Sequence, residues 1–417
     1  MDKREFLKTL STCTIGALLG QAVWARYAEL APSALAEDEP FWALVRAKYT
    51  LKDEYINFEN GYYSMQSNDV LEAFVAHVRA VNREAAHYMR TRAAADKLAV
   101  RRELAQLAGC SPDELIITRN TTESLDSVIA GRDWKPGDEA LMAEQDYGAM
   151  LAMFAQEARR HGLVQRMVSL PLDPRDDDEL VELYANAITP KTKLLMISHM
   201  VNITGQILPV RRICDMAHSK GVEVLVDGAH AFAHFEFSIP QLQCDYYGAS
   251  LHKWLGCPLG AGILYVRKER VRGLWPMFGE SDVADDDIAK LNHTGTHPVH
   301  TDLAIRDALT FHNSIGIQRK EARLRHLQRS WTTRVRGRSG ITLNTPSAPQ
   351  RACAIANVAV GSLTPSELAR VLLERYSIYT VAIDRPGVRG VRVTPHIYTS
   401  MDEVDALVRA LNELAAS

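Results

Sequence analysis

Several features that the sequence lacks exclude whole classes of protein. It has no concentration of charge: the net charge of the 417 residues is -3, and basic residues gather only in isolated pairs, which argues against a nucleic-acid surface. It has no apolar run strong enough for a stable membrane span, because the stretch 9–25 is interrupted by Gly, Thr, Ser and Gln. What remains is a globular chain, 47% hydrophobic, with room for two domains.

Cysteine is scarce and follows no pattern. The six cysteines show no C-x-x-C spacing, so the sequence predicts neither a disulfide framework nor a metal site. They stand at Cys13, Cys110, Cys214, Cys244, Cys257 and Cys353. We expect most of them to be small buried hydrophobic residues.

The N-terminus has the composition of an export leader. A basic segment, 3–8, precedes the mildly apolar stretch, and Ala34-Leu35-Ala36 stands before acidic residues as a small-x-small cleavage pattern. The basic segment looks like a twin-arginine signal with Lys3 in the first arginine place. We therefore predict an export signal over residues 1–36, a periplasmic mature protein and no membrane attachment after cleavage. The alternative is a cytoplasmic protein with an amphipathic leader helix.

The stretch 222–266 carries the clearest functional signal. Residues 222–226 form a short, apolar, β-branched run, which is typical of a buried strand in a parallel sheet. Asp227 follows this strand directly, in the region where open α/β sheets bind their ligands. A second expected strand, 245–250, leads into Lys253 and then into a glycine-rich turn.

The combination of this lysine and this aspartate suits Schiff-base chemistry. Partial desolvation lowers the pKa of a lysine, which leaves a free amine that can attack an aldehyde. A carboxylate facing a pyridine nitrogen keeps the ring protonated and able to accept electrons. Taken singly, Asp227 could cap a helix and Lys253 could lie on the surface. Ser250 and His252, which lead into the lysine, make the Schiff-base interpretation the better one.

The motifs Val226-Asp227-Gly228-Ala229-His230 and Ser250-Leu251-His252-Lys253 resemble the core of the class V aminotransferases. This group of pyridoxal-phosphate (PLP) enzymes includes the cysteine desulfurases and isopenicillin N epimerase. The resemblance implies fold type I: an α/β large domain with a mostly parallel seven-stranded sheet and a smaller α+β C-terminal domain. Strands separated by helices of ten or more residues also indicate a parallel sheet. The expected parts are the export signal 1–36, an N-terminal segment 37–70, a large PLP-binding domain 71–297 and a small domain 298–417.

The resemblance also implies roles for individual residues, with PLP as the cofactor. Lys253 forms the Schiff base with it, and Asp227 pairs with its pyridine nitrogen. Arg392 binds the α-carboxylate of the substrate, because a guanidinium offers a planar, two-pronged set of donors. The other implied contacts are His230 and Asn202 at the phenolic oxygen, Ser250 and His252 at the phosphate, Asn60 and Gly61 near the substrate, and Thr296 at the phosphate of a neighbouring subunit. The last of these implies a homodimer with shared active sites. For Asn60 and Gly61 a plain turn is the alternative.

Two further cofactor contacts are expected before the central stretch. Thr121 and Thr122 follow a strand and open a helix, and the N-terminus of a helix binds anions, so we assign them to the phosphate. The alternative is a simple helix cap. After the next expected strand, 139–142, the family places a ring that stacks on the pyridine, a histidine in the desulfurases. Gln145 stands where we align that histidine, so Tyr147 is the stacking candidate.

The sequence departs from the desulfurases in one respect that bears on the reaction. A desulfurase needs a nucleophilic cysteine on a loop shortly before the carboxylate-binding arginine, and the stretch 378–390 contains none. Cys257 lies in the wrong segment, so persulfide chemistry is not expected. Loss of the α-proton, with Lys253 as the base, can lead to epimerisation, transamination or loss of a β-substituent. The residues do not choose among these.

We expect an isopenicillin N epimerase-like enzyme, tailoring an exported peptide metabolite such as a siderophore. Its partner would be a small-molecule or peptide substrate that carries a carboxylate. A transaminase or β-lyase of a free amino acid is the alternative within the family. A non-catalytic binding protein on the same fold is the alternative of another class, but it predicts loss of Lys253, Asp227 or Arg392, and all three are present.

Overall fold

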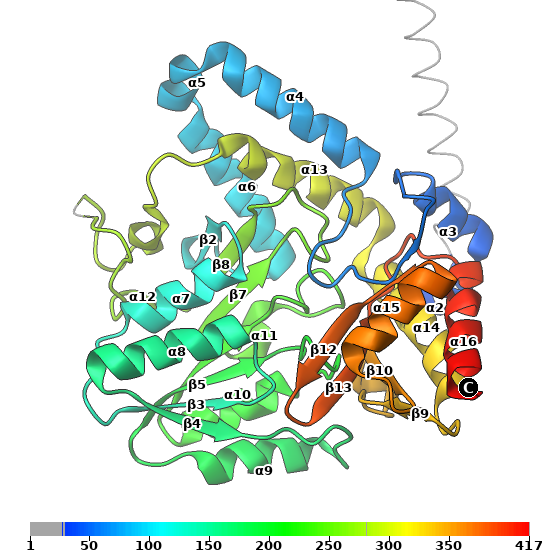
Figure 1. The fold of residues 1–417 in the computed structure, drawn as a ribbon. Helices are drawn as coiled ribbons and strands as arrows, with labels where there is room; N and C mark the ends of the chain where they lie inside the picture. Colours follow the sequence, from blue (N-terminus) through cyan, green and yellow to red (C-terminus); the bar gives the residue numbers. More distant parts are fainter. Residues whose placement is uncertain (1–26, 28–29, 281, 417) are drawn as a thin grey trace, which may run out of the picture.

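The computed structural model describes residue 27, residues 30–280 and residues 282–416 (Figure 1). Most of the predicted export signal therefore lies outside the described residues. Within the described part of the chain, no helix is both long enough and apolar enough to cross a membrane.

A seven-stranded sheet forms the centre of the large domain. Its strand order is β2-β8-β7-β6-β5-β3-β4, and only β8 runs antiparallel to its neighbours, so the predicted mostly parallel sheet is confirmed. The strands are β2 (Leu115–Thr118), β3 (Glu139–Ala143), β4 (Val164–Val168), β5 (Thr192–Ser198), β6 (Glu223–Asp227), β7 (Tyr246–Ser250) and β8 (Gly262–Val266).

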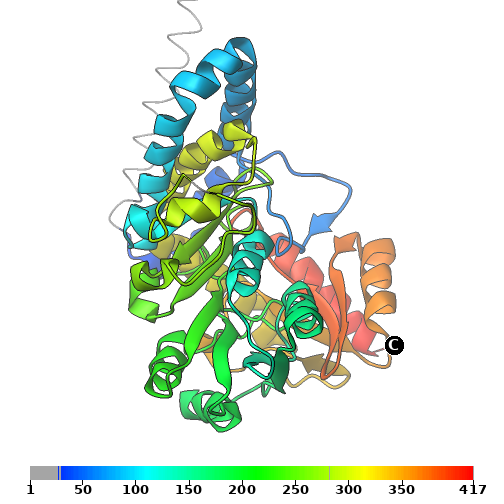
Figure 2. The same ribbon diagram turned by 90° about the vertical axis from the view of Figure 1, so that its left-hand side faces the viewer.

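Helices cover both faces of this sheet, as Figures 1 and 2 show. Along β5, Leu194 and Met196 join one buried apolar cluster, while Leu195 and Ile197 join the other. This alternation explains why the strands are apolar on both faces. The helices of the first face are α7 (Thr121–Gly131) and α8 (Gly148–His161), and those of the second include α9 (Asp177–Ala187) and α10 (Val210–Ser219). The short α11 (Ile239–Leu242) and α12 (Lys268–Val271) lie in the connections around β7 and β8.

A group of helices lies above one end of the sheet in Figure 1. It contains α4 (Asn68–Glu84), α5 (Ala86–Thr91), α6 (Ala93–Ala108) and α13 (Val299–Ile315), and α13 packs against α4 and α6. Helix-forming residues rich in Arg and His continue from about 301 to 334 in the sequence, but the chain breaks at Gly316, where φ is 88°. That conformation is open to glycine and strained for other residues. It ends α13 and allows α14 (Ile317–Val335) to take a new direction.

The small domain is an antiparallel sheet with helices packed on it. The strand order is β12-β13-β10-β9, and a separate parallel pair joins β1 to β11. Because β1 precedes the large domain in sequence, the start of the described chain is tied to its end. The strands of these two sheets and the helices beside them are β1 (Ile56–Asn57), β9 (Ile341–Leu343), β10 (Ala356–Val360), β11 (Ile378–Tyr379), β12 (Val381–Arg385), β13 (Val388–Val393), α15 (Pro365–Tyr376) and α16 (Met401–Ala416).

The segment around the predicted cleavage point is packed into the protein. Helix α2 (Pro32–Ala36) lies against α14, and α3 (Glu39–Arg46), blue in Figure 1, lies beside the red α16. Leu35 is fully buried, and its carbonyl oxygen accepts a hydrogen bond of 2.7 Å from the indole of Trp42. The carbonyl of Ala36 accepts one of 3.0 Å from the buried Arg323. A protease could therefore reach the bond after Ala36 only if α2 left its place.

Candidate active site

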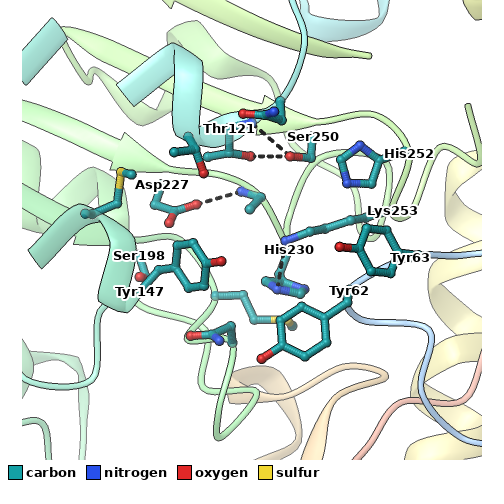
Figure 3. A pocket seen from close by; sticks show the side chains of 16 residues that line it. Tyr62, Tyr63, Thr121, Tyr147, Ser198, Asp227, His230, Ser250, His252 and Lys253 are labelled. Atoms are coloured by element: carbon teal, nitrogen blue, oxygen red, sulfur yellow. Dashed lines mark hydrogen bonds between the residues drawn. The ribbon is translucent and has the colours of Figure 1, made fainter. Parts of the chain in front are cut away.

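A cavity of about 210 Å³ opens at the carboxyl ends of the parallel strands, where the sequence places it (Figure 3). Most of the predicted site residues meet in its lining: Thr121, Thr122, Tyr147, Asn202, Asp227, His230, Ser250, His252 and Lys253. They come from the last residues of the strands β6 and β7, from the start of α7 and from loops that are far apart in sequence. The sheet thus assembles the site that the motifs predicted.

Lys253 has the properties of a Schiff-base lysine. It lies in the loop after β7, and burial, assisted by Arg392, lowers its pKa to about 8, against the opposing effect of Asp227. Its Nζ is 3.2 Å from Nε2 of His230 (Figure 3). Near neutral pH a useful fraction of this amine is therefore uncharged, as attack on an aldehyde requires.

A lowered pKa does not by itself identify the reactive lysine. Burial also lowers the pKa of Lys320, to about 7. The Nζ of Lys320, however, donates a hydrogen bond to the carbonyl of Trp254, and Lys320 is not among the residues that line the cavity. The position of Lys253 inside the cavity is what distinguishes it.

Asp227 ends β6 and is buried at the cavity wall. Its Oδ1 accepts a 2.9 Å hydrogen bond from the N–H of Ala229, and burial raises its pKa, opposed by that bond and by Lys253. Because a single hydrogen bond offsets little of the cost of burying this charge, a cationic partner would stabilise the ionised carboxylate. Asp146 is a second buried carboxyl, whose pKa burial raises to about 7, but it lies behind the lining, where Ser198 and the N–H of Ala143 bond to it.

The start of α7 has the geometry of an anion site. The N–H of Thr121 lies 2.9 Å from Oγ of Ser250, and the two hydroxyl oxygens are 2.7 Å apart. The capping role left open for the threonines belongs instead to Asn120, whose side chain accepts the N–H of Glu123. Thr121 and Thr122 are thus free of that role at the positive end of the helix.

Two histidines and a tyrosine also line the cavity. The buried Nδ1 atoms of His230 and His252 have no hydrogen-bond partner among the described residues. Tyr147 is 39% exposed, and burial, followed by Tyr62, raises the pKa of its hydroxyl. Gln145 is buried behind it, where it accepts the N–H of Leu170, so it cannot take the stacking position.

These groups fit PLP well. A helix N-terminus with hydroxyl groups suits a phosphate, the buried carboxylate suits a protonated pyridine, and the amine of Lys253 suits an aldehyde. The unpartnered nitrogens of His230 and His252 are further donors or acceptors that a ligand can satisfy. No cluster of His, Cys, Asp and Glu in the described part of the chain could hold a metal ion.

Arg392 lies outside the cavity lining and is already paired within the protein. Its side chain is fully buried, and Nη2 and Nε donate to the two carboxylate oxygens of Glu59 at 2.7 and 3.1 Å. Its Nη1 donates to the carbonyl of Asn202 at 3.1 Å, and Asn202 does line the cavity. The predicted carboxylate-binding arginine is thus next to the pocket, but no local sequence pattern indicates its carboxylate partner.

The other predicted substrate and cofactor contacts also lie outside the lining. The side-chain amide of Asn60 donates to the carbonyl of Thr394 at 2.8 Å and accepts the hydroxyl of Tyr398, so it holds the fold together. Gly61 packs directly against Arg392. Thr296 is exposed on the surface of this single chain, and its role towards a neighbouring subunit stays a prediction.

Some residues of the lining were missed by the sequence analysis. Tyr62 and Tyr63 project into it directly after Gly61, and Ser198 is the last residue of β5. The rule that strand ends carry ligand contacts would have identified Ser198. Asn120, Met150, Met200 and Ala229 complete the lining.

Comparison with known proteins agrees with the geometry. The aminotransferase class-V family model matches residues 64–410. Isopenicillin N epimerase of Streptomyces clavuligerus is 31% identical over 331 residues, 75% of this chain and 83% of that protein. The epimerase of Amycolatopsis lactamdurans is 32% identical over 338 residues, 76% of this chain and 84% of that protein. Cysteine desulfurase CsdA of Escherichia coli is 35% identical over a shorter stretch of 185 residues, 43% of this chain and 45% of that protein.

Solved structures share the fold. Cysteine desulfurase CsdA from Escherichia coli matches with a TM-score of 0.78 and 25% identity, over 90% of this chain and 98% of that chain. The cystine C-S lyase C-DES, in a complex with its reaction product cysteine persulfide, matches with a TM-score of 0.79 and 23% identity, over 87% of this chain and 98% of that chain. Another C-DES structure, with glycine covalently linked to its PLP cofactor, has a TM-score of 0.80 and 23% identity, over 88% of this chain and 99% of that chain. These matches confirm the predicted fold.

Proposed function

The chain belongs to the class V aminotransferase family of PLP-dependent enzymes, and from that premise we propose that it acts at the α-carbon of an amino acid or of a peptide-linked amino acid, as an isopenicillin N epimerase-like enzyme. The observation that carries this proposal is the pairing of Lys253 and Asp227 in one cavity whose lining contains no cysteine among the described residues.

The side chains of the cavity divide the work of such a reaction. PLP, when bound, supplies an electron-withdrawing ring to the α-carbon. Lys253 holds and moves the proton at that carbon, and His230, 3.2 Å from its Nζ, keeps the amine in place. Asp227 supplies negative charge at the pyridine end, while Thr121 and Ser250 hold the phosphate end. Return of the proton to the opposite face gives epimerisation.

The small domain argues against a persulfide mechanism. Arg385 of β12 pairs with Val388 of β13, so only Pro386 and Gly387 form the tip of this hairpin, in the region where a desulfurase carries its cysteine loop. Burial raises the thiol pKa of each described cysteine, Cys257 included, which disfavours the nucleophilic thiolate.

Elimination of a β-substituent is the second candidate. The cystine C-S lyase C-DES shares the fold, with a TM-score of 0.79 and 23% identity. Unlike a desulfurase, a lyase of this kind needs no cysteine nucleophile at the site. Lys253 would serve as the base for either reaction.

Exchange of the α-proton with heavy water tests the proposal. We expect the holoenzyme to introduce deuterium at the α-carbon of at least one member of a panel of free amino acids and γ-glutamyl and α-glutamyl dipeptides. Mass spectrometry with chiral separation then distinguishes the products. The mirror-image amino acid indicates epimerisation, a keto acid with aminated cofactor indicates transamination, and pyruvate indicates elimination.

Two results would contradict the proposal. One is the absence of exchange and of product from every member of the panel by a fully loaded holoenzyme. The other is sulfide release from L-cysteine that alkylation of the thiols blocks, because that result would place a nucleophilic cysteine in the reaction. The variant Cys257→Ala should leave the exchange rate unchanged.

The predicted homodimer is part of the proposal. It rests on Gly295 and Thr296, an exposed glycine-threonine pair in a loop that the family uses towards a neighbouring subunit. The expected mass by light scattering is twice that of the chain, and Thr296→Val should weaken PLP binding. A monomer that binds PLP with full affinity would contradict the proposed homodimer.

Export to the periplasm is also proposed, on the sequence of the basic segment 3–8, the mildly apolar stretch 9–25 and the cleavage pattern at residues 34–36. Fractionation should place the protein in the periplasm, and replacement of Lys3 and Arg4 by glutamine should retain it in the cytoplasm. The mature N-terminus is informative because Leu35 is fully buried and Ala36 nearly so. A first residue at Glu37 would mean that α2 is removed before it docks. Unchanged fractionation of the double variant would refute export by this signal.

A further inference from the structure

We propose that the turn formed by residues 59–62 fixes the side chain of Arg392 in place. Within this turn, Glu59 is a positioning residue that orients the guanidinium towards the carboxylate of the substrate. The inference rests on the proposed function, in which the substrate is an amino acid. It adds the residue that makes carboxylate recognition possible, which lies 333 positions away in sequence.

Glu59 and Arg392 form a two-pronged ion pair inside the protein. Nη2 and Nε of Arg392 lie 2.7 and 3.1 Å from Oε1 and Oε2 of Glu59, and the two side chains are 0% and 5% exposed. A buried guanidinium without such a partner would be strongly destabilising. The pair therefore fixes both the charge and the plane of the arginine.

The turn prevents Glu59 from moving away when a substrate arrives. Its Oε1 also accepts the N–H groups of Gly61 and Tyr62, each at 2.8 Å. The turn itself is joined to the small domain, because the N–H of Asn60 donates to Thr394 at 2.8 Å. Displacing the carboxylate would break the ion pair and both backbone bonds at once, so we infer that Glu59 stays bound while substrate binds.

Two neighbours of Glu59 also pack against the guanidinium. A Cβ atom on Gly61 would lie 2.9 Å from Nη2 of Arg392, so the close approach of the turn requires glycine at this position. The ring of Tyr62 lies 4.3 Å from the guanidinium carbon, within the range of a cation–π contact. Tyr62 also lines the cavity beside Lys253 (Figure 3), so the held arginine is at the pocket wall.

The contacts leave Arg392 with donors for a carboxylate. Glu59 uses Nε and one N–H of Nη2, and the carbonyl of Asn202 uses one N–H of Nη1. Each terminal nitrogen therefore keeps one N–H that these contacts do not use. A carboxylate that binds there adds charge-assisted hydrogen bonds to an arginine that is already oriented.

The same pair also acts on the catalytic lysine. Arg392 lowers the pKa of Lys253, and Glu59 raises it. Removing the charge of Glu59 should therefore lower the pKa of Lys253 further. A residue with a purely structural role would not change this value in that direction.

A pair of probes that differ only in the carboxylate tests the inference. The probes are 2-aminoisobutyrate, which has no α-proton, and isopropylamine, which lacks the carboxylate. Binding of each to the holoenzyme is followed through the absorbance of bound PLP. We expect Glu59→Gln to weaken binding of 2-aminoisobutyrate at least about tenfold, the effect of losing a charge-assisted hydrogen bond, and to change isopropylamine binding less than about twofold.

Two further variants accompany Glu59→Gln. Gly61→Ala, which pushes a Cβ against Arg392, should reproduce the selective loss while keeping the charge of Glu59. Glu182→Gln, an exposed carboxylate on α9, is the matched control and should change neither probe. In the apoproteins, the pH dependence of Lys253 acetylation, measured by mass spectrometry, should show a lower pKa only for Glu59→Gln.

The outcomes separate this inference from the proposed function. Tighter binding of 2-aminoisobutyrate to Glu59→Gln would mean that Glu59 competes with the substrate, and equal losses for both probes would mean a general role in the fold; either overturns the inference. If wild-type holoenzyme does not prefer 2-aminoisobutyrate to isopropylamine, the site does not recognise a carboxylate, and the amino-acid function fails together with it.

Discussion

Replacing Lys253 with alanine should abolish turnover and leave the cofactor bound only by non-covalent contacts. The residue supplies the one cavity amine whose pKa burial brings down to about 8, and it is both the attachment point and the base in the proposed reaction. Loss of an acid–base group alone lowers rates by about 10²–10⁴-fold, so we expect α-proton exchange to fall at least that far. Thr121, Ser250 and Asp227 remain to hold the cofactor.

The measurement uses borohydride and peptide mass spectrometry. In the wild-type holoenzyme, reduction should fix the cofactor to the peptide that contains Lys253, and in Lys253→Ala it should fix none. Lys320→Met is the informative control, because Lys320 is also buried with a pKa lowered to about 7 but lies outside the cavity lining. Cofactor fixed to Lys320, or fixed as well in the Lys253→Ala variant, would show that the site has been misplaced.

The pH dependence of cofactor capture provides a second check. Only the neutral amine attacks the aldehyde, so the rate of PLP uptake by the apoprotein should rise with pH and level off above about 8. An ordinary surface lysine would give a rise that continues to near pH 10. Uptake that continues to rise above pH 9 would therefore contradict a buried Lys253.

Much of the large domain could be predicted from the sequence because its strands carry a strong local signal. The run 222–226 is apolar and β-branched, and it forms most of β6, with Asp227 as the last residue of the strand. Since parallel strands end at one edge of the sheet, Asp227, Ser250 and Asn202 had to lie near each other. The cavity lining follows from that geometry.

Other features depend on contacts that no local pattern encodes. Glu59 and Arg392 are distant in sequence, and their pairing is decided by how the N-terminal turn meets the small domain. Strand β4 was missed because it lies at the edge of the sheet, where most of its side chains are exposed or only partly buried, and it lacks an apolar run. The break at Gly316 was missed because helical residues continue on both sides of it.

Replacing Asp227 with asparagine should have opposite effects on stability and on activity. Burial raises the pKa of Asp227 above the ordinary aspartate value, so the folded apoprotein is destabilised when pH exceeds that value and the carboxylate ionises. Below it, both folded and unfolded chains are protonated and the effect disappears. Asp227→Asn should therefore make the apoprotein more stable than wild type at pH 7, and the difference should shrink as the pH falls towards 4.

The same substitution should lower α-proton exchange by about 10²–10³-fold, the range for loss of one preorganised electrostatic contact at a reacting group. The asparagine keeps the shape of the side chain, and its carbonyl oxygen can still accept the N–H of Ala229, but it has no charge to keep a pyridine nitrogen protonated. Thermal unfolding of the apoproteins and exchange rates of the holoenzymes measure the two effects.

Asp146→Asn is the matched control: it neutralises a neighbouring buried carboxyl that does not line the cavity, and it should leave exchange within a few-fold of wild type. Full activity in Asp227→Asn, or an equal loss in Asp146→Asn, would show that the charge of Asp227 is not what the reaction uses.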